Sequence, residues 1–451
     1  MNNTVKVIGG GLAGCEAAYY LANKGIKVSL YEMKPIKKSP AHKTELFAEL
    51  VCSNSLKAAR IESAAGLLKE EMRRLGSVCL EAADKFSVPA GGALAVEREG
   101  FSSYITEKIK SHPNIEVIHE CITEIPKEGV SVIATGPLTD DTLAENIRKN
   151  LGSEYLSFYD AAAPIISGDS IDMNFAFYAS RYGKGDGDDY INCPLNREEY
   201  EAFHSALISA ERAPLKDFET DPNVYEGCMP IEILASRGTD AIRFGPMKPV
   251  GLTDPNTGRR PWAVLQLRKE NKEGTMYNLV GFQTNLKFGE QKRVFSMIPA
   301  LKNAEFLRFG IMHRNSFINS PMLLNRNLSL KANPNVFFAG QLSGVEGYME
   351  SAASGILSGI NAYSYISGNH PLILPKTTMI GAIIDYITDS QTKKFQPMGA
   401  NFGLLPPLNE RIRDKKERYL SLANRGLADF DKTLTEFINN NKRKNENEDN
   451  C

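Results

Sequence analysis

The first 32 residues constrain the fold more than any other stretch of the chain. Val5–Ile8 predicts a buried strand, residues 9–14 read Gly-Gly-Gly-Leu-Ala-Gly, and Cys15–Asn23 predicts a helix. A second predicted strand, Ile26–Tyr31, is followed directly by an acidic residue. Glycines in the pattern G-x-G-x-x-G between a strand and a helix allow a tight turn and let a pyrophosphate approach the helix N-terminus. The stretch therefore predicts a dinucleotide-binding βαβ unit, with Gly9, Gly10, Gly11, Leu12, Ala13 and Gly14 at the phosphates and Glu32 at a ribose hydroxyl.

Two later strands end in similar glycine turns. The apolar run from Val130 ends in Ala134-Thr135-Gly136, and the run from Asn335 ends in Gly340-Gln341. Gly344 and Gly347 follow the second run, and a helix is expected over Ala352–Ile366. A second strand-to-helix junction hundreds of residues from the first indicates one FAD site, since a domain that binds only NAD has no need of it. We expect Thr135, Gly136, Gly340, Gln341 and Gly347 to contribute to this site.

The middle of the chain lacks the strand–glycine–helix pattern of the two ends. A glycine–aspartate stretch, Tyr182–Asp189, cannot continue a helix or a strand. Short mixed elements follow until about His313. We predict an α/β protein in which a Rossmann-like FAD-binding domain, residues 1–182 and 316–438, carries a smaller inserted α+β domain, residues 183–315. Residues 439–451 are predicted to be a flexible polar tail.

Composition excludes several classes of protein. The 451 residues carry a net charge of −1, and hydrophobic residues make up 42%, as in ordinary soluble proteins. No uncharged apolar window approaches the ~18 residues needed to span a bilayer, and the N-terminus lacks the features of a secretory signal. The seven cysteines and six histidines fall in no disulfide or metal-ligand pattern. We therefore expect a cytoplasmic protein with neither a membrane segment nor a metal.

Charge is unevenly distributed in the predicted insertion. Residues 183–235 hold 4 basic and 12 acidic residues, whereas residues 236–293 hold 11 basic and 5 acidic ones. Trp262, Phe282 and Phe288 lie among the basic residues, and such mixtures bind phosphates and stack on unpaired bases. A solvated face above core aromatics is an equal alternative. The candidate RNA-contacting residues are Arg259, Arg260, Arg268, Lys292 and Arg293.

Two cysteines stand in distinctive surroundings. Cys52 lies where an apolar run meets capping residues and Lys57, a setting that favours the thiolate form. Cys228 lies between Gly227 and Pro230 in a predicted turn. For either residue, a small buried apolar side chain is the commoner alternative.

Several motifs together resemble one known family. They are residues 9–14, 30–35 (Leu-Tyr-Glu-Met-Lys-Pro), 50–55 (Leu-Val-Cys-Ser-Asn-Ser), 244–252 (Phe-Gly-Pro-Met-Lys-Pro-Val-Gly-Leu), 262–268, 281–286 and 338–348. The chain resembles the TrmFO family, the folate- and FAD-dependent tRNA (uracil-5-)-methyltransferases, as far as about residue 430.

The resemblance implies a reaction and a set of participants. FAD is the expected cofactor, methylenetetrahydrofolate the carbon donor, and NADH or NADPH the reductant. The expected product is 5-methyluridine in the T-loop of tRNA, at tRNA position 54. The family's two catalytic cysteines fall on Cys52 and Cys228, and Tyr348 matches a position beside the flavin. One thiolate would add to C6 of the uracil, which makes C5 nucleophilic.

Three alternatives remain open from the sequence. The same chemistry could act on ribosomal RNA, or the chain could belong with the GidA/MnmG enzymes that modify the tRNA wobble uridine. The third alternative is a noncatalytic RNA-binding flavoprotein or a plain NAD(P)H:FAD oxidoreductase, although neither explains two poised thiols together with a basic insertion.

Overall fold

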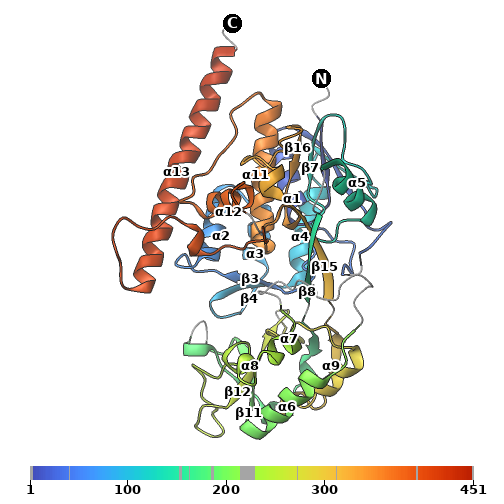
Figure 1. The fold of residues 1–451 in the computed structure, drawn as a ribbon, viewed down its shortest axis with the longest axis vertical. Helices are drawn as coiled ribbons and strands as arrows, with labels where there is room; N and C mark the ends of the chain where they lie inside the picture. The colour runs from blue at the N-terminus through green and yellow to red at the C-terminus, as the bar shows by residue number, and fades with distance from the viewer. Residues whose placement is uncertain are drawn as a thin grey trace.

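The computed structural model describes residues 4–39, 41–151, 155–161, 163–183, 187–213, 229–271, 273–310, 312–392 and 395–448, with only the backbone described for 155–161, 313–315 and 443–448. The chain forms a larger upper domain, which holds both chain ends, and a smaller lower domain (Figure 1). An antiparallel pair of strands, β8 (Tyr155–Ala161) and β15 (Met312–Ile318), runs between the two domains.

The upper domain is built on a five-stranded sheet in which all neighbouring strands are parallel. The strand order is β16 (Val336–Phe338), β7 (Val130–Ile133), β1 (Thr4–Ile8), β2 (Lys27–Glu32) and β6 (Ile115–His119). Val5, Val7, Leu30 and Val132 on the three central strands are fully buried, as expected for a parallel sheet covered on both faces. Because all five strands are parallel, their carboxyl ends meet at one edge, where ligands bind in open α/β sheets.

Helices α1 (Leu12–Asn23) and α11 (Tyr348–Ile366) pack against each other unusually closely. A methyl group on Gly355 would lie 2.2 Å from the Ala13 carbonyl oxygen, and one on Gly359 would lie 3.0 Å from Ala17 Cα. Glycine at these two positions therefore lets the two backbones touch. The contact places the loop before α11 beside the loop before α1, although more than 300 residues separate them.

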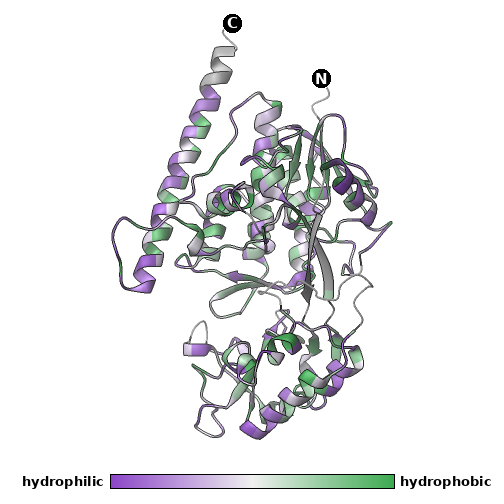
Figure 2. Ribbon diagram, in the orientation of Figure 1, coloured by the Kyte–Doolittle hydropathy of each residue, from purple (hydrophilic) through white to green (hydrophobic). Residues whose placement is uncertain are grey.

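The remaining elements of the upper domain complete its core, and Figure 2 shows apolar residues along the sheet and its covering helices. They are β3 (Ser55–Ala58), β4 (Ser87–Val88), β5 (Ala93–Val96), α2 (Ala64–Arg74), α3 (Val78–Lys85), α4 (Arg98–Lys110), α5 (Asp141–Leu151), α10 (Ser320–Leu323), α12 (Met379–Thr388) and α13 (Lys415–Glu448). Helix α13 continues to Glu448, so most of the stretch predicted as a flexible polar tail is helical. None of the described helices is both long and apolar enough to cross a bilayer.

The lower domain has its own sheet and its own core, which runs from Ile166 to Ala304. The order of the antiparallel strands is β10 (Phe177–Tyr178), β11 (Tyr190–Leu195), β12 (Ala263–Lys269), β13 (Met276–Leu279), β9 (Ile165–Ser167) and β14 (Phe306–Arg308). Its helices are α6 (Arg197–Ser209), α7 (Ile231–Ser236), α8 (Ala241–Phe244) and α9 (Phe288–Phe295).

Strand β9 makes the lower domain start earlier than residue 183. It pairs with β13 and β14, which lie more than 100 residues further along the chain, and such long-range pairing leaves no local signal. Tyr182 and Asp189, the ends of the glycine–aspartate stretch, lie between β10 and β11 and therefore inside this domain. We therefore propose that the inserted domain begins near residue 163.

Candidate active site

A long pocket opens at the carboxyl edge of the parallel sheet. Its walls come from the ends of β1, β2, β6 and β7 and from the loop after β16. Its enclosed space is about 160 Å³, with further open space at its mouth. Of the residues expected to bind a cofactor, those lining it are Gly9, Gly10, Gly11, Leu12, Ala13, Glu32, Thr135, Gly136, Gly340, Gln341 and Tyr348. Two glycine turns far apart in sequence thus share one pocket.

The turn before α1 has the shape that a dinucleotide requires. Gly9 has φ +103°, and a methyl group on Gly14 would lie 1.8 Å from the Gly9 carbonyl oxygen, so both positions require glycine. Gly11 differs from them, because its φ is −75° and a methyl group there would meet no protein atom within 4 Å. Helix α1 has neither a side-chain cap nor an acidic residue in its first turn, which leaves its N-terminal N–H groups to a ligand. These features fit a pyrophosphate seated against Gly11.

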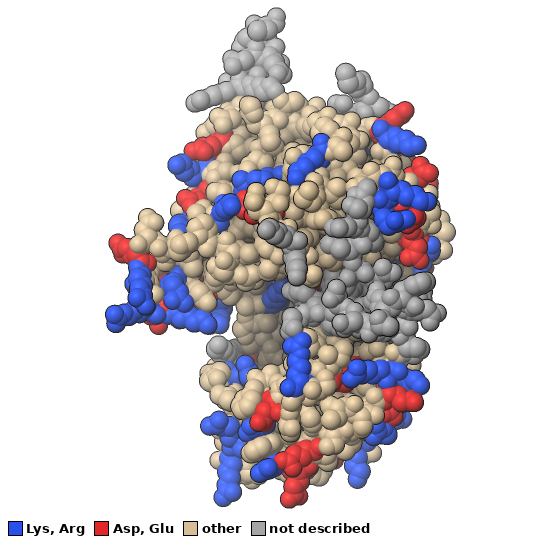
Figure 3. All heavy atoms as spheres, in the orientation of Figure 1, with Lys and Arg blue, Asp and Glu red and all other residues tan. Residues whose placement is uncertain are grey.

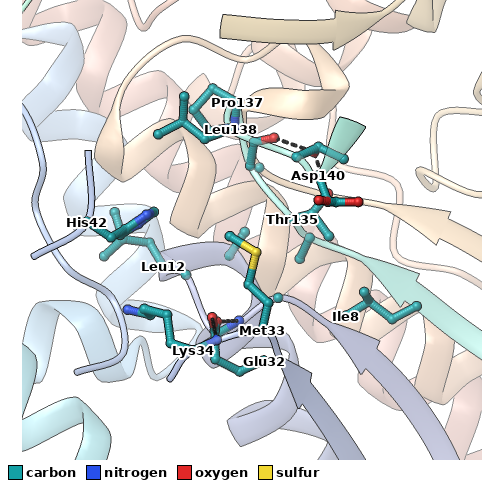
Figure 4. Close-up of a pocket in the computed structure, with 18 of the residues that line it drawn as sticks. Ile8, Leu12, Glu32, Met33, Lys34, His42, Thr135, Pro137, Leu138 and Asp140 are labelled. Carbon is teal, nitrogen blue, oxygen red and sulfur yellow. Dashed lines mark hydrogen bonds between the residues drawn. The ribbon is translucent and has the colours of Figure 1, made fainter. Parts of the chain in front are cut away.

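Glu32 is fixed beside the glycine turn. Its Oε2 accepts a hydrogen bond from the Gly10 N–H at 2.7 Å, and its Oε1 accepts one from the Lys34 N–H at 2.9 Å (Figure 4). Each carboxylate oxygen retains a lone pair for a ribose hydroxyl. His42 also lines the pocket, where burial and the charge of Lys34 lower the pKa of its imidazole and keep it neutral at pH 7.

Tyr348, the first residue of α11, connects this pocket to the Cys52 loop. Its hydroxyl oxygen accepts hydrogen bonds from the Cys52 N–H at 2.7 Å and the Ser53 N–H at 3.3 Å. Burial and the neighbouring Cys52 raise the pKa of Tyr348, so the hydroxyl stays protonated at neutral pH. Val51 lines the pocket as well, which places the half-buried Cys52 at its margin.

Two arginines hold the same loop from the other side. Arg98 Nη2 and Arg308 Nη2 donate to the Cys52 carbonyl oxygen at 3.2 and 3.0 Å, and Arg98 also donates to the Leu50 carbonyl oxygen. Arg98 belongs to the upper domain and Arg308 to the lower one. Residue 52 is therefore clamped through its backbone at the junction of the domains.

Arg268 completes the clamp instead of facing RNA. It is only 6% exposed, and it donates to Asn54 Oδ1 at 3.0 Å and to Ser53 Oγ at 2.8 Å. Strand β12 is central in its sheet and six of its seven residues are buried, so Arg268 points into the domain junction. The predicted RNA contact of Arg268 is therefore corrected to a structural role, because its side chain is buried and hydrogen-bonded to this loop.

The loop lies in a positive environment. Glu270 forms an ion pair with Arg98 at 2.5 Å, and its side chain is 1% exposed. Burial and the like charge of Arg98 lower the pKa of Arg308 to about 10. Guanidinium groups favour a negative charge beside them, so this arrangement is compatible with the thiolate form of Cys52.

We predict that this buried ion pair matters more for stability than an exposed one. Glu270→Gln removes the counter-ion of Arg98, and an uncompensated buried charge costs roughly 3–5 kcal/mol. The thermal unfolding midpoint should therefore fall clearly. The matched control is Glu145→Gln, which breaks an exposed pair with Arg148 on α5 and should leave the midpoint unchanged. Equal midpoints for the two variants would contradict the clamp.

The other predicted residues fall into two groups. Gly14 and Gly347 do not line the pocket. Gly14 packs on Gly9, and a methyl group on Gly347 would lie 2.2 Å from Glu350 Oε2. Of the basic residues, Arg259, Arg260, Lys292 and Arg293 are exposed.

Cys228 lies outside the described residues. Among those that are described, no group of three or more His, Cys, Asp or Glu side chains is arranged to hold a metal.

Sequence reasoning missed Arg98, Glu270 and Arg308. None of the three lies in a recognisable motif. Glu270 of the lower domain pairs with Arg98 of the upper one, and Arg308 reaches the Cys52 carbonyl oxygen from the lower domain, so these contacts depend on the docking of the two domains. No signal in the sequence marks them as a group.

The comparisons with known proteins agree with this geometry. Residues 4–370 match the family described as glucose inhibited division protein A. The Methylenetetrahydrofolate--tRNA-(uracil-5-)-methyltransferase TrmFO of Acetivibrio thermocellus is 57% identical over 438 residues, which is 97% of this chain and 99% of that protein. The protein of the same name from Enterococcus faecalis is 58% identical over 427 residues, covering 95% and 98% of the two chains.

Among solved structures, GidA of Aquifex aeolicus superimposes with a TM-score of 0.66. The match covers 95% of this chain and 76% of that one at 18% identity, which supports the fold alone. The relatives of 57–58% identity support the TrmFO reading over the alternative that placed the chain with the GidA enzymes. High identity over nearly the full length of its relatives shows that the chain belongs to the TrmFO family, within the wider glucose inhibited division protein A group.

Proposed function

We propose that this protein is an FAD-dependent methyltransferase that converts a tRNA uridine to 5-methyluridine with methylenetetrahydrofolate as carbon donor. The observation that carries the proposal concerns Tyr348. This residue lines the dinucleotide pocket, and its hydroxyl oxygen accepts a hydrogen bond from the backbone N–H of Cys52. A reactive sulfur is thereby held at the margin of the pocket. Relatives that are 56–58% identical carry the name of this activity, which supports the same assignment.

The dinucleotide pocket would hold the FAD. The backbone at Gly11 and the N-terminus of α1 would bind its pyrophosphate, and Glu32 would bind a ribose hydroxyl. The loop from Gly340 to Tyr348 would hold the flavin end. FAD, when bound and reduced by NADH or NADPH, supplies the hydride that completes the new methyl group.

Cys52 and Cys228 are the proposed catalytic pair. Addition of a thiolate to C6 of the uracil forms an S–C6 bond and moves electron density to C5, which then bonds to the methylene carbon of the folate. The bonds from that carbon to the folate nitrogens break, and tetrahydrofolate leaves. A base removes the C5 proton, and the S–C6 bond breaks as the product leaves. One thiol acts as the nucleophile, and the other assists proton transfer or shields the intermediate. Because this chemistry requires free thiols, it suits a reducing cytoplasm.

Residues around Cys52 position it rather than react. Tyr348, Arg98 and Arg308 fix its backbone, and the guanidinium charge favours the thiolate. The exposed Arg259, Arg260, Lys292 and Arg293 are proposed to contact RNA phosphates. The uridine at tRNA position 54 is the proposed target, and ribosomal RNA is the second candidate.

A donor test checks the proposed activity. Purified protein is incubated with unmodified tRNA, NADPH and carbon-labelled methylenetetrahydrofolate, and the digested nucleosides are analysed by mass spectrometry. We expect labelled 5-methyluridine only when both the folate and the reductant are present. A parallel reaction supplies S-adenosylmethionine alone, and ribosomal RNA replaces tRNA in a third. Methylation driven by S-adenosylmethionine alone would contradict the proposal, and labelling of ribosomal RNA alone would change the substrate.

A further inference from the structure

A column of phenylalanine rings runs through the lower domain and ends at its surface. Phe288, the first residue of α9, stacks on Phe309 with the ring centroids 4.9 Å apart and the planes 15° from parallel. Phe309 stacks in turn on Phe306 at 5.3 Å and 5°. Phe306 packs on Phe295 at 6.5 Å, and Phe295 is completely buried. The column therefore rests on the domain core.

The outermost ring is open to solvent. Phe288 is 53% exposed, although its inner face is covered by Phe309. A single exposed apolar residue is ordinary on a protein surface. Here, however, the ring is held in one orientation by two parallel rings beneath it, so it presents a fixed flat face. Proteins that bind unpaired nucleic acid use such faces to stack bases, and each base contributes without regard to its identity.

Three basic residues lie close to Phe288 along the chain, on α9 and its N-cap. Lys292 lies one turn along α9, is exposed, and forms no ion pair with any residue that the structure describes. Lys287 and Arg293 are about half exposed, and they pair with Glu211 and Glu290 respectively. Lys and Arg side chains appear along the edge of the lower domain where Figure 1 places α9 (Figure 3). An exposed ring beside an exposed lysine suits a nucleotide, whose base stacks and whose phosphate is anionic.

The column is continuous with the Cys52 loop. Phe309 directly follows Arg308, which donates to the Cys52 carbonyl oxygen at 3.0 Å. Chemistry on a base in a folded RNA requires that base to leave its stack, and this exposes the bases beside it. A strand that delivers a uridine to Cys52 would therefore carry a neighbouring unstacked base toward the column.

We propose that Phe288 is a base-stacking site for a nucleotide near the target uridine. This inference rests on the proposed function, since it takes the RNA as substrate. The aromatic face would replace the stacking that the neighbouring base loses when the target is extruded. Lys292 would contact an adjacent phosphate. Phe288 would thus contribute to RNA affinity and not to the chemical step.

The test compares variants of the full-length, FAD-loaded protein. Phe288→Ala removes the ring, Phe288→Leu keeps an apolar side chain, and Phe288→Tyr keeps the aromatic face. The matched control is Phe244→Ala, which removes a 71% exposed ring on α8. The probe is a T-arm RNA hairpin with 2-aminopurine placed in turn at each position flanking the uridine. Binding is measured by fluorescence anisotropy, stacking by 2-aminopurine quenching, and turnover by kcat and KM.

We expect Phe288→Ala and Phe288→Leu to weaken hairpin binding and raise KM roughly 5- to 100-fold, with kcat at saturating RNA unchanged. Quenching at one flanking position should disappear in both variants and return in Phe288→Tyr. Phe244→Ala should behave like the wild-type protein in both measurements.

Three outcomes would overturn the inference. Phe288→Ala could bind the hairpin as tightly as the wild type, or Phe288→Leu could restore wild-type binding and quenching. The third is a change of oligomeric state in Phe288→Ala, which would mean that a second copy of the chain covers the ring. Wild-type protein that binds the hairpin without methylating it would overturn only the proposed function. Failure to bind the hairpin at all would overturn both.

Discussion

Replacing Cys52 by alanine is expected to lower methylation by at least ~10³-fold, because the residue carries one of the two proposed reactive thiols. The substitution should leave the loop in place. Tyr348, Arg98 and Arg308 all bind residue 52 through its backbone N–H or carbonyl oxygen, and alanine retains both groups. The loss would therefore report chemistry and not a displaced loop. Methylation is measured with labelled folate, and FAD content is measured by absorbance.

The control for this prediction is Cys193→Ala. Cys193 is fully buried in the core of the lower domain, where burial raises the pKa of its thiol and keeps it inert. This variant should lose some thermal stability and retain its turnover. A 5-fluorouracil-substituted T-arm RNA, which traps covalent adducts, assigns the role of Cys52: the nucleophile forms no adduct when replaced by alanine. Cys52→Ala protein with wild-type turnover would contradict a catalytic role for Cys52.

Gly11→Val is expected to weaken FAD binding at least ~100-fold while the protein still folds, because the new side chain would occupy the space of the pyrophosphate. Gly11 suits this test better than its neighbours. Its backbone conformation suits any residue, and the added carbon would meet no protein atom within 4 Å. Substitution of Gly14 would instead force a carbon to within 1.8 Å of the Gly9 carbonyl oxygen and disturb the fold itself.

FAD affinity is measured by titrating the apoprotein and following flavin fluorescence. Gly289→Ala supplies the control, since its added carbon also meets open space but lies on α9, away from the glycine turns. This control should bind FAD like the wild type. Native FAD affinity in Gly11→Val, with circular dichroism that shows a folded protein, would place the pyrophosphate elsewhere.

The predictions that succeeded from sequence concern local structure. The unit from β1 to β2 has the elements expected of it, because a glycine turn, a helix start and a strand alternation are each determined within a few residues. The second glycine junction was also predicted, and it shares a pocket with the first. Helix α11 nevertheless starts at Tyr348, four residues earlier than expected, because a glycine at residue 347 ends the preceding turn.

The chain's sequence by itself determined the nucleotide-binding unit and the family, since both depend on residues that are neighbours or stand in fixed patterns. Only the tertiary structure decided how Cys52 is held. Its partners at positions 98, 308 and 348 lie 46, 256 and 296 residues away: Arg98 and Tyr348 come from other parts of the upper domain, and Arg308 comes from the lower domain that docks against it. The same docking buries Arg268, which was predicted to contact a phosphate. Its guanidinium instead donates hydrogen bonds to Asn54 and Ser53 of the Cys52 loop. A residue type indicates which interactions are available, but whether a charged side chain meets water or a partner depends on the surface that covers it.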